Sequence, residues 1–202
     1  MTEMNRVARF FVNLSAARRA ARAYEWIRRD VPMPPAARCV EIGCGHGDLA
    51  ARIVEGFRPA RYVATDLDSR QIETARRAAG QRYPSGLPPA LMFRTADMRH
   101  LPFDDASFDV VLAVAALHHA GESHHDPTGI PEALSEIGRV LRPGGLVAYQ
   151  EFLHKELIRT WFAGHGFSIE RIRSRRRLES VVASKSGVSS VPARSREGSP
   201  GL

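Results

Sequence analysis

One short stretch, residues 40–48 with the sequence VEIGCGHGD, constrains the fold of this chain more than any other. An apolar run comes first, glycines follow at Gly43, Gly45 and Gly47, and an apolar-periodic segment then begins at Leu49. Glycines let the backbone turn sharply and approach a ligand without a Cβ atom in the way. The pattern predicts a strand, a tight turn and the start of a helix, whose free N–H groups face a carboxylate or a phosphate.

The glycine spacing separates two classes of ligand. A dinucleotide-binding fingerprint reads G-x-G-x-x-G, whereas this chain reads G-x-G-x-G and has Asp48 at the sixth position. A glycine is wanted there for close packing of the helix against the strand. An NAD-linked oxidoreductase is therefore a disfavoured alternative.

Apolar segments that follow the glycine turn alternate with helical patterns. Further strands are predicted at residues 62–66, 91–95, 108–114, 146–151, 167–173 and 178–184. Helices are predicted from residue 69 toward 83, at 134–145 and at 153–163, with an irregular crossover at 99–107. This alternation is typical of a doubly wound α/β sheet.

The chain before the glycine turn has a helical pattern. Apolar residues in segment 4–29 recur at alternating steps of three and four, which places them on one helix face. A break is expected near Asn13, because Ser15 can cap a new helix. Prolines between residues 32 and 35 then end the helix.

These motifs, taken in order, resemble the class I S-adenosylmethionine-dependent methyltransferases of the small-molecule type, which carry an E-x-G-x-G-x-G signature. The similarity runs from Arg38 to about Phe152, with a family-like ending to about Ser184. It implies a mostly parallel, seven-stranded Rossmann-like sheet with a C-terminal antiparallel hairpin and an N-terminal helical lid. The domains implied are an N-terminal helical segment (1–37), a methyltransferase domain (38–184) and a disordered tail (185–202).

The same resemblance assigns residues to S-adenosylmethionine, the methyl donor. The glycine turn would wrap the methionine part, Glu41 would meet its ammonium group or orient the loop, and Asp66 would accept from both ribose hydroxyls. Leu67 would pack against the adenine, while Asp97 and the backbone of Met98 would bind the adenine amino group. The predicted donor-binding residues are Glu41, Gly43, Cys44, Gly45, Gly47, Asp66, Leu67, Asp97, Met98 and Val114.

Each of the three acids also has a plain structural interpretation. Glu41 could bind backbone amides, and Asp97 could form a turn. Asp66 could cap the next helix, although Asp68 is placed for that role.

Four histidines crowd the loop HHAGESHH after the fourth predicted strand: His118, His119, His124 and His125. The L-H-H sequence there is commonplace in the family that this chain resembles, which favours a structural role for His118. His119 is the tentative general base, because histidine titrates near neutrality and this loop faces the acceptor. The spacing matches no recognised zinc signature and no cysteine is near, so no metal is expected.

The distribution of charge bears on the methyl acceptor. The net charge is +7, yet residues 39–170 carry 13 Lys and Arg against 17 Asp and Glu. This acidic core lacks the basic stripe that tracks phosphates, so nucleic acid is an unlikely partner. Residues 113–116 also lack the Asn/Asp-Pro-Pro-aromatic motif of enzymes that methylate base amines.

We therefore expect methyl transfer to a small-molecule O-, N- or C-nucleophile by in-line displacement. Two alternatives stay open: methylation of RNA or protein, and a donor-binding partner subunit without activity. The sequence does not indicate the acceptor's identity or the oligomeric state.

The use of cysteine fits a reducing compartment. Its two cysteines, Cys39 and Cys44, lie in one strand and its turn, so they form no disulfide framework. No apolar run reaches the roughly 20 residues of a membrane helix, and the N-terminus lacks a signal-peptide core. A cytoplasmic location without membrane attachment is expected.

Overall fold

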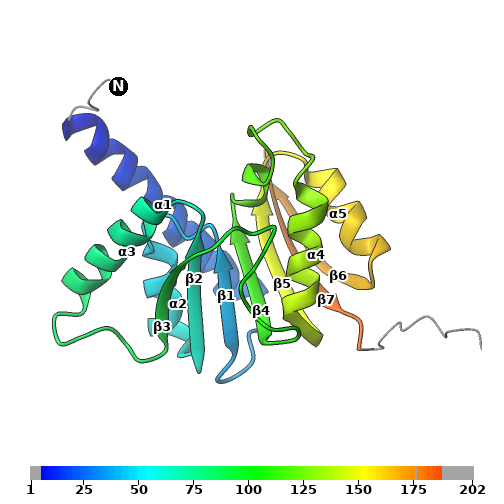
Figure 1. The fold of residues 1–202 in the computed structure, drawn as a ribbon, viewed down its shortest axis with the longest axis horizontal. Helices are drawn as coiled ribbons and strands as arrows, with labels where there is room; N and C mark the ends of the chain where they lie inside the picture. The colour runs from blue at the N-terminus through cyan, green and yellow to red at the C-terminus, as the bar shows by residue number, and fades with distance from the viewer. Residues whose placement is uncertain (1–5, 176, 188–202) are drawn as a thin grey trace, which may run out of the picture.

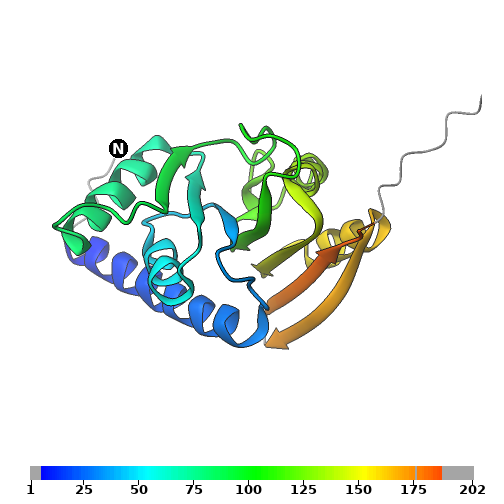
Figure 2. The ribbon, with the colours of Figure 1, turned by 90° about the horizontal axis from the view of Figure 1, so that it is seen from below.

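A computed structural model describes residues 6–175 and 177–187, which form one mixed sheet between two layers of helices (Figures 1 and 2). The strands of these residues are β1 (Arg38–Ile42), β2 (Arg61–Asp66), β3 (Leu91–Thr95), β4 (Phe108–Val114), β5 (Leu141–Glu151), β6 (Phe167–Arg175) and β7 (Leu178–Lys185). The helices are α1 (Arg6–Asp30), α2 (Asp48–Phe57), α3 (Ser69–Arg82), α4 (Ile130–Val140), α5 (Lys155–Gly164) and the short 3₁₀ helix η1 (Leu117–His119).

The strand order is β3-β2-β1-β4-β5-β7-β6. Strands β1 to β5 are parallel, whereas β7 runs antiparallel to both β5 and β6. This confirms the predicted doubly wound sheet with its C-terminal hairpin. The strand order reverses between β1 and β4, and ligands bind at the carboxyl ends of the strands at such a reversal.

Both faces of the sheet are apolar, as expected for parallel strands covered on each side. Val111 and Ala113 of β4 belong to the core cluster that includes α4 and α5. Val110 and Leu112, which alternate with them, belong to the cluster that includes α1, α2 and α3. Each helical layer therefore has a core of its own on one face of the sheet.

Helix α1 runs from Arg6 to Asp30 without interruption, so the predicted break near Asn13 is wrong. A single asparagine costs a helix only a fraction of a kcal/mol relative to alanine. Farther along, Ala23, Trp26 and Ile27 are buried in the cluster shared with α2. Among the described residues, no helix is long and apolar enough to cross a membrane.

The predicted helix at 134–145 is displaced in the structure. Helix α4 begins at Ile130 and ends at Val140. Pro131 lies in its first turn, where a backbone N–H would have no hydrogen-bond partner within the helix, so proline is tolerated there. Leu141 is already extended and pairs with Phe108, and a bulge then shifts the register to Val110–Leu146. The proline and glycines after Leu141 therefore lie within β5 rather than at the end of a helix.

The C-terminal prediction is corrected at one residue. Lys185, assigned to the tail, closes β7, and its Nζ donates to Gly138 O (2.7 Å) and Leu141 O (2.8 Å). The predicted disorder of residues 188–202 lies outside the described residues. The domain boundaries stay predictions.

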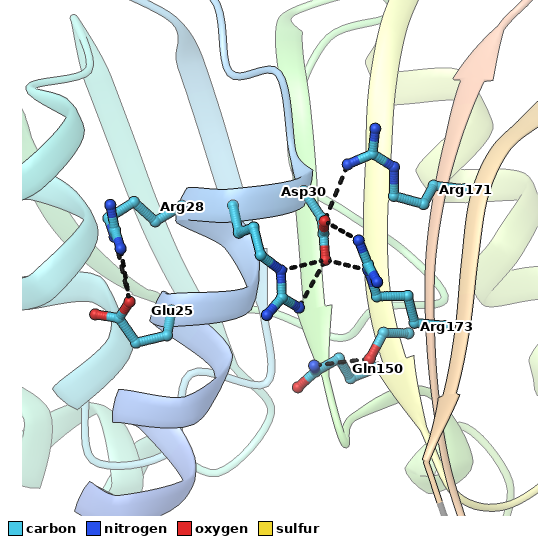
Figure 3. Close-up of polar contacts among 8 residues, drawn as sticks. Glu25, Arg28, Asp30, Gln150, Arg171 and Arg173 are labelled. Atoms are coloured by element: carbon cyan, nitrogen blue, oxygen red, sulfur yellow. Dashed lines mark hydrogen bonds and ion pairs between the residues drawn. The ribbon is translucent and has the colours of Figure 1, made fainter.

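A buried acid attaches the end of α1 to the hairpin (Figure 3). Asp30 accepts from Arg29 Nη2 at 2.9 Å, from Arg171 Nη1 at 2.9 Å and from Arg173 Nε at 2.7 Å. The hydrogen bond from Arg29, followed by those from Arg173 and Arg171, holds the pKa of this carboxyl well below its usual range. Two arginines of the C-terminal hairpin are thus engaged by a buried carboxylate.

Candidate functional site

A cleft of about 880 Å³ opens at the carboxyl ends of β1, β2 and β4. Its walls unite the glycine turn, the end of β2, and the loop that follows β4. Sequence-predicted residues that line it are Glu41, Gly43, Cys44, Gly45, Asp66, Leu67, Met98, Val114 and His119. The geometry of the sheet brings these residues to one cleft, and their contacts with the donor stay predictions. Arg19 and Ala20 of α1 also line the cleft, which is where the predicted lid would act.

The glycine turn lies against the loop after β4. Gly43 has φ +71°, and a Cβ atom at this position would lie only 2.6 Å from the Cβ of Ala116. Glycine is therefore required both for the turn and for the approach of the two loops. The next residue, Cys44, donates its N–H to Thr65 O at 2.8 Å, which fastens the turn to β2. The turn is thus packed against the loop after β4 and tied to β2.

Asp66 is fixed at the end of β2 by two backbone donors. Its Oδ2 accepts from Gly45 N at 2.9 Å and its Oδ1 from Asp68 N at 3.0 Å. Helix α3 is capped by Asp68 instead, whose side chain accepts from Arg70 N at 2.9 Å. The capping interpretation of Asp66 therefore does not hold, and its half-buried carboxylate faces the cleft beside the glycine turn.

Glu41 is a buried acid in the wall of the cleft. Tyr62 donates its hydroxyl to Glu41 Oε2 at 2.8 Å. Burial, opposed by the Tyr62 hydrogen bond and assisted by the nearby charges of Asp66 and Asp48, raises the pKa of Glu41 to about 7. This carboxyl therefore changes its charge near neutral pH, where a cationic ligand would favour the ionised form.

We expect the Glu41→Gln variant to gain stability relative to the parent protein as the pH rises. The folded-state pKa of about 7 lies above the usual 4.5, so the acid's contribution is complete below about pH 4.5 and is lost as the pH rises through 7. Glutamine keeps an acceptor for Tyr62 and cannot ionise. Denaturant unfolding at about pH 5 and about pH 8 should show a relative gain of up to about 3 kcal/mol.

The matched control is Glu73→Gln, which replaces an exposed acid on α3. Its difference from the parent protein should be the same at both pH values. If the difference in free energy of unfolding between Glu41→Gln and the parent protein were also the same at both pH values, the Glu41 carboxyl would not titrate in this range.

The predicted adenine-side residues divide into two groups. Leu67 is 59% exposed and lines the cleft together with Met98. Asp97 instead binds Arg99, whose backbone N lies 2.9 Å from Oδ1 and whose Nη2 lies 2.7 Å from Oδ2. This is the turn-forming arrangement, and among the described residues Asp97 is not part of the cleft wall. Its contact with adenine stays a prediction.

Glu151 is a residue of the site that sequence reasoning missed. It is fully buried at the end of β5, and its Oε1 accepts from Ala116 N (2.8 Å) and Leu117 N (2.7 Å). Its Oε2 lies 2.8 Å from Nδ1 of the buried His118. With Nδ1 donating to the carboxylate, Nε2 is the nitrogen of His118 left for another partner. The sequence feature that could have identified Glu151 is its place as an acid at the last position of β5, the strand that pairs with β4.

His119 and His124 are more exposed than His118 and share the same wall of the cleft. Neighbouring atoms desolvate the His119 ring and lower its pKa, and the charges of His118 and His124 lower it further. The base form of His119 is therefore favoured at neutral pH. Its role as general base stays a prediction.

Residues 40–149 match a family model described as "Methyltransferase domain". The match covers more than half of the chain and includes β1, β2, β4 and the glycine turn. The chain therefore belongs to the class I S-adenosylmethionine-dependent methyltransferases.

Curated relatives share this region. A phthiotriol/phenolphthiotriol dimycocerosates methyltransferase of Mycobacterium ulcerans is 34% identical over 145 residues, which are 72% of this chain and 48% of that protein. A fatty-acid O-methyltransferase of Mycolicibacterium smegmatis is 37% identical over 61% of this chain and 40% of its own length. The chain thus spans about half the length of the curated relatives it matches.

The fold alone is shared with the solved structure of the (4+2)-cyclase SpnF. The two have a TM-score of 0.68 at 18% identity, over 82% of this chain and 80% of that one. This likeness supports the architecture and not an activity.

Proposed function

We propose that this protein transfers the methyl group of S-adenosylmethionine to an oxygen, nitrogen or carbon nucleophile of a small molecule. The observation that carries this proposal is the single cleft of about 880 Å³ that unites the glycine turn, Asp66 and the histidine loop. A volume of this size is within the range of pockets that hold cofactors and drug-sized ligands. Family membership implies the donor.

The donor fits the residues on one side of the cleft. Asp66 offers a carboxylate to the ribose diol, and the glycine turn lies beside it in the same cleft wall. Glu41 offers a carboxyl of raised pKa to the ammonium group. Leu67 and Met98 supply apolar surface for adenine, and Val114 lies at the end of β4, beside the place of the sulfonium.

The acceptor side is partly apolar. Phe152 is 42% exposed and lines the cleft, and its ring centroid lies 4.5 Å from that of His118. The named relatives act on phthiotriols and on fatty acids, which carry large apolar parts. Both facts support a small organic acceptor with an apolar portion next to its nucleophile.

Nucleic acid is disfavoured as the acceptor. Arg171 and Arg173 of the basic hairpin bind Asp30, and the core is acidic. A protein that tracks phosphates needs its arginines free on one face.

Positioning supplies most of the catalysis in this proposal. When bound, S-adenosylmethionine supplies a methyl group activated by a sulfonium cation. Transfer would form a bond between the acceptor atom and the methyl carbon as the carbon–sulfur bond breaks, and His119 would take any proton that the acceptor loses. In-line placement can lower the barrier by roughly 7–11 kcal/mol, so a base is needed only for acceptors that must lose a proton first.

Transfer of a radiolabelled methyl group tests the proposal. The purified chain should label small molecules from a panel of hydroxy and carboxy lipids, phenols and amines. Labelling of bulk RNA or protein without any small molecule would overturn the choice of acceptor. Tight binding of S-adenosylhomocysteine without turnover on the panel would favour a donor-binding partner subunit.

A further inference from the structure

Three imidazole rings gather on the acceptor side of the cleft. His118 and His119 are contributed by η1, and His124 by the loop that follows it. The ring centroid of His119 lies 4.2 Å from that of His118 and 4.3 Å from that of His124. One ring nitrogen of each residue lies within 4.8 Å of the others.

This spacing is close to that of a metal site. A zinc ion binds histidine nitrogens at about 2.0–2.1 Å, which places tetrahedral ligand nitrogens about 3.4 Å apart. Small rotations about the side-chain bonds of the two exposed rings, His119 and His124, would close the remaining gap. Neither ring is fixed in a packed core, so such rotations meet little resistance.

Glu151 supplies the outer-shell contact that metal-binding histidines need. Metal-ligating histidine almost always donates its other ring N–H to a carboxylate or carbonyl, which fixes the tautomer and the ring orientation. The pair of His118 Nδ1 and Glu151 Oε2, at 2.8 Å, has this arrangement and is buried. Glu151 is itself held by two backbone N–H groups, so His118 is oriented in advance.

The loop conformation explains why the sequence spacing did not predict this site. Asp126 accepts from Glu122 N at 2.8 Å and from Thr128 N at 3.0 Å, which folds the loop back on itself. His154 Nε2 lies 3.1 Å from His124 O and ties the loop to the segment before α5. The loop thereby returns His124 to the rings of η1, although five residues separate it from His118.

We propose that His118, His119 and His124 bind one divalent transition-metal ion of the zinc class. Three neutral imidazoles favour zinc, cobalt, nickel or copper over magnesium or calcium. All three rings line the cleft, so a fourth coordination position would open toward the acceptor. This inference differs from the expectation drawn from the sequence, which was that no metal binds.

The part that the metal ion would play in methyl transfer rests on the proposed function, whereas the binding of the ion does not. At the open position it would bind an oxygen or nitrogen of the acceptor and make a bound hydroxyl more acidic. With the ion in place, His119 is a ligand rather than a base, so the proton of a bound hydroxyl would pass to water.

Metal titration of the chelator-treated full chain, without donor or acceptor, tests the proposal. Cobalt(II) is followed by its visible absorption and zinc by calorimetry, and one ion per chain is expected. His119→Ala and His124→Ala should each weaken binding by more than about 100-fold, and Glu151→Gln by about 10- to 100-fold. His46→Ala removes a histidine of the same cleft outside the cluster, so it should leave metal binding unchanged.

Substoichiometric binding, or binding that survives in the His119→Ala/His124→Ala double variant, would overturn the metal site. Binding of S-adenosylhomocysteine to the same preparation is measured in parallel. Donor binding without metal binding contradicts only the metal site, whereas metal binding without methyl transfer contradicts only the proposed function.

Discussion

Replacing Asp66 with alanine should weaken the binding of S-adenosylhomocysteine by at least about 100-fold. A hydrogen bond to a charged group contributes about 1.5–3 kcal/mol, and a carboxylate can accept one from each ribose hydroxyl. Asp66 is fixed in the cleft by hydrogen bonds from Gly45 N and Asp68 N, so its side chain loses little conformational entropy when the donor binds. Calorimetric titration of the parent chain and the variant measures the effect.

Asp68→Asn is the matched control, because it changes the neighbouring acid and keeps a good helix cap. Its affinity should stay within about threefold of the parent protein, since a change of cap between Asp and Asn is nearly neutral.

The 2′-deoxy analogue of S-adenosylhomocysteine shows whether Asp66→Ala weakens binding by removing a contact with the ribose or by disrupting the glycine turn. Loss of the 2′-hydroxyl should weaken binding to the parent protein but not to Asp66→Ala, because the partner is already absent. An Asp66→Ala variant that still discriminates against the 2′-deoxy analogue would assign the ribose contact to another residue.

The sheet could be predicted closely because parallel strands covered on both faces are continuous apolar runs. The strand predicted at residues 108–114 coincides with β4, and that at 91–95 with β3. The segment around Leu141 was misassigned because a local helical pattern competed with pairing to Phe108, a residue 33 positions earlier. Pairing of that kind depends on the tertiary fold.

The part of the cleft that holds Glu41 and Asp66 could be predicted for a related reason. Its residues follow strand ends, and topology alone brings the ends of parallel strands together, as for Glu41 and Asp66. The histidine side could not be predicted, because it depends on the path of a loop. Asp126 folds that loop back through two backbone hydrogen bonds, and no spacing rule describes such a path.

Replacing Glu151 with alanine should destabilise the protein by about 3–9 kcal/mol, at about 1–3 kcal/mol for each donor left without its acceptor. Three buried donors would lose their acceptor: Ala116 N, Leu117 N and His118 Nδ1. An unsatisfied buried polar group costs about 1–3 kcal/mol, and the total is comparable with the net stability of many domains. Denaturant unfolding at neutral pH measures the loss.

The antiparallel partner of Glu151 in the sheet offers a control. Glu179 lies directly opposite on β7 and is also buried, but it pairs with the more exposed Arg159 at 3.1 Å. In Glu179→Ala, that arginine can turn to solvent, so the loss should be clearly smaller. Equal losses in the two variants would mean that burial of an acid, rather than its three donors, sets the cost.

Glu151→Gln should fold and reveal what the acid does for the cleft. The amide oxygen can still accept from the backbone of Ala116 and Leu117, whereas the amide N–H₂ now faces His118 Nδ1 and favours the tautomer with its proton on Nε2. Nitrogen NMR of the imidazole should report that exchange of protonated nitrogen. A neutral amide oxygen is a weaker acceptor than a carboxylate, so the hydrogen bonds that hold Ala116 and Leu117 should weaken. Because Ala116 lies against Gly43, donor binding should weaken as well, although Glu151 lies outside the cleft wall of the described residues. A changed tautomer with unchanged donor affinity would instead confine the role of Glu151 to the histidine side.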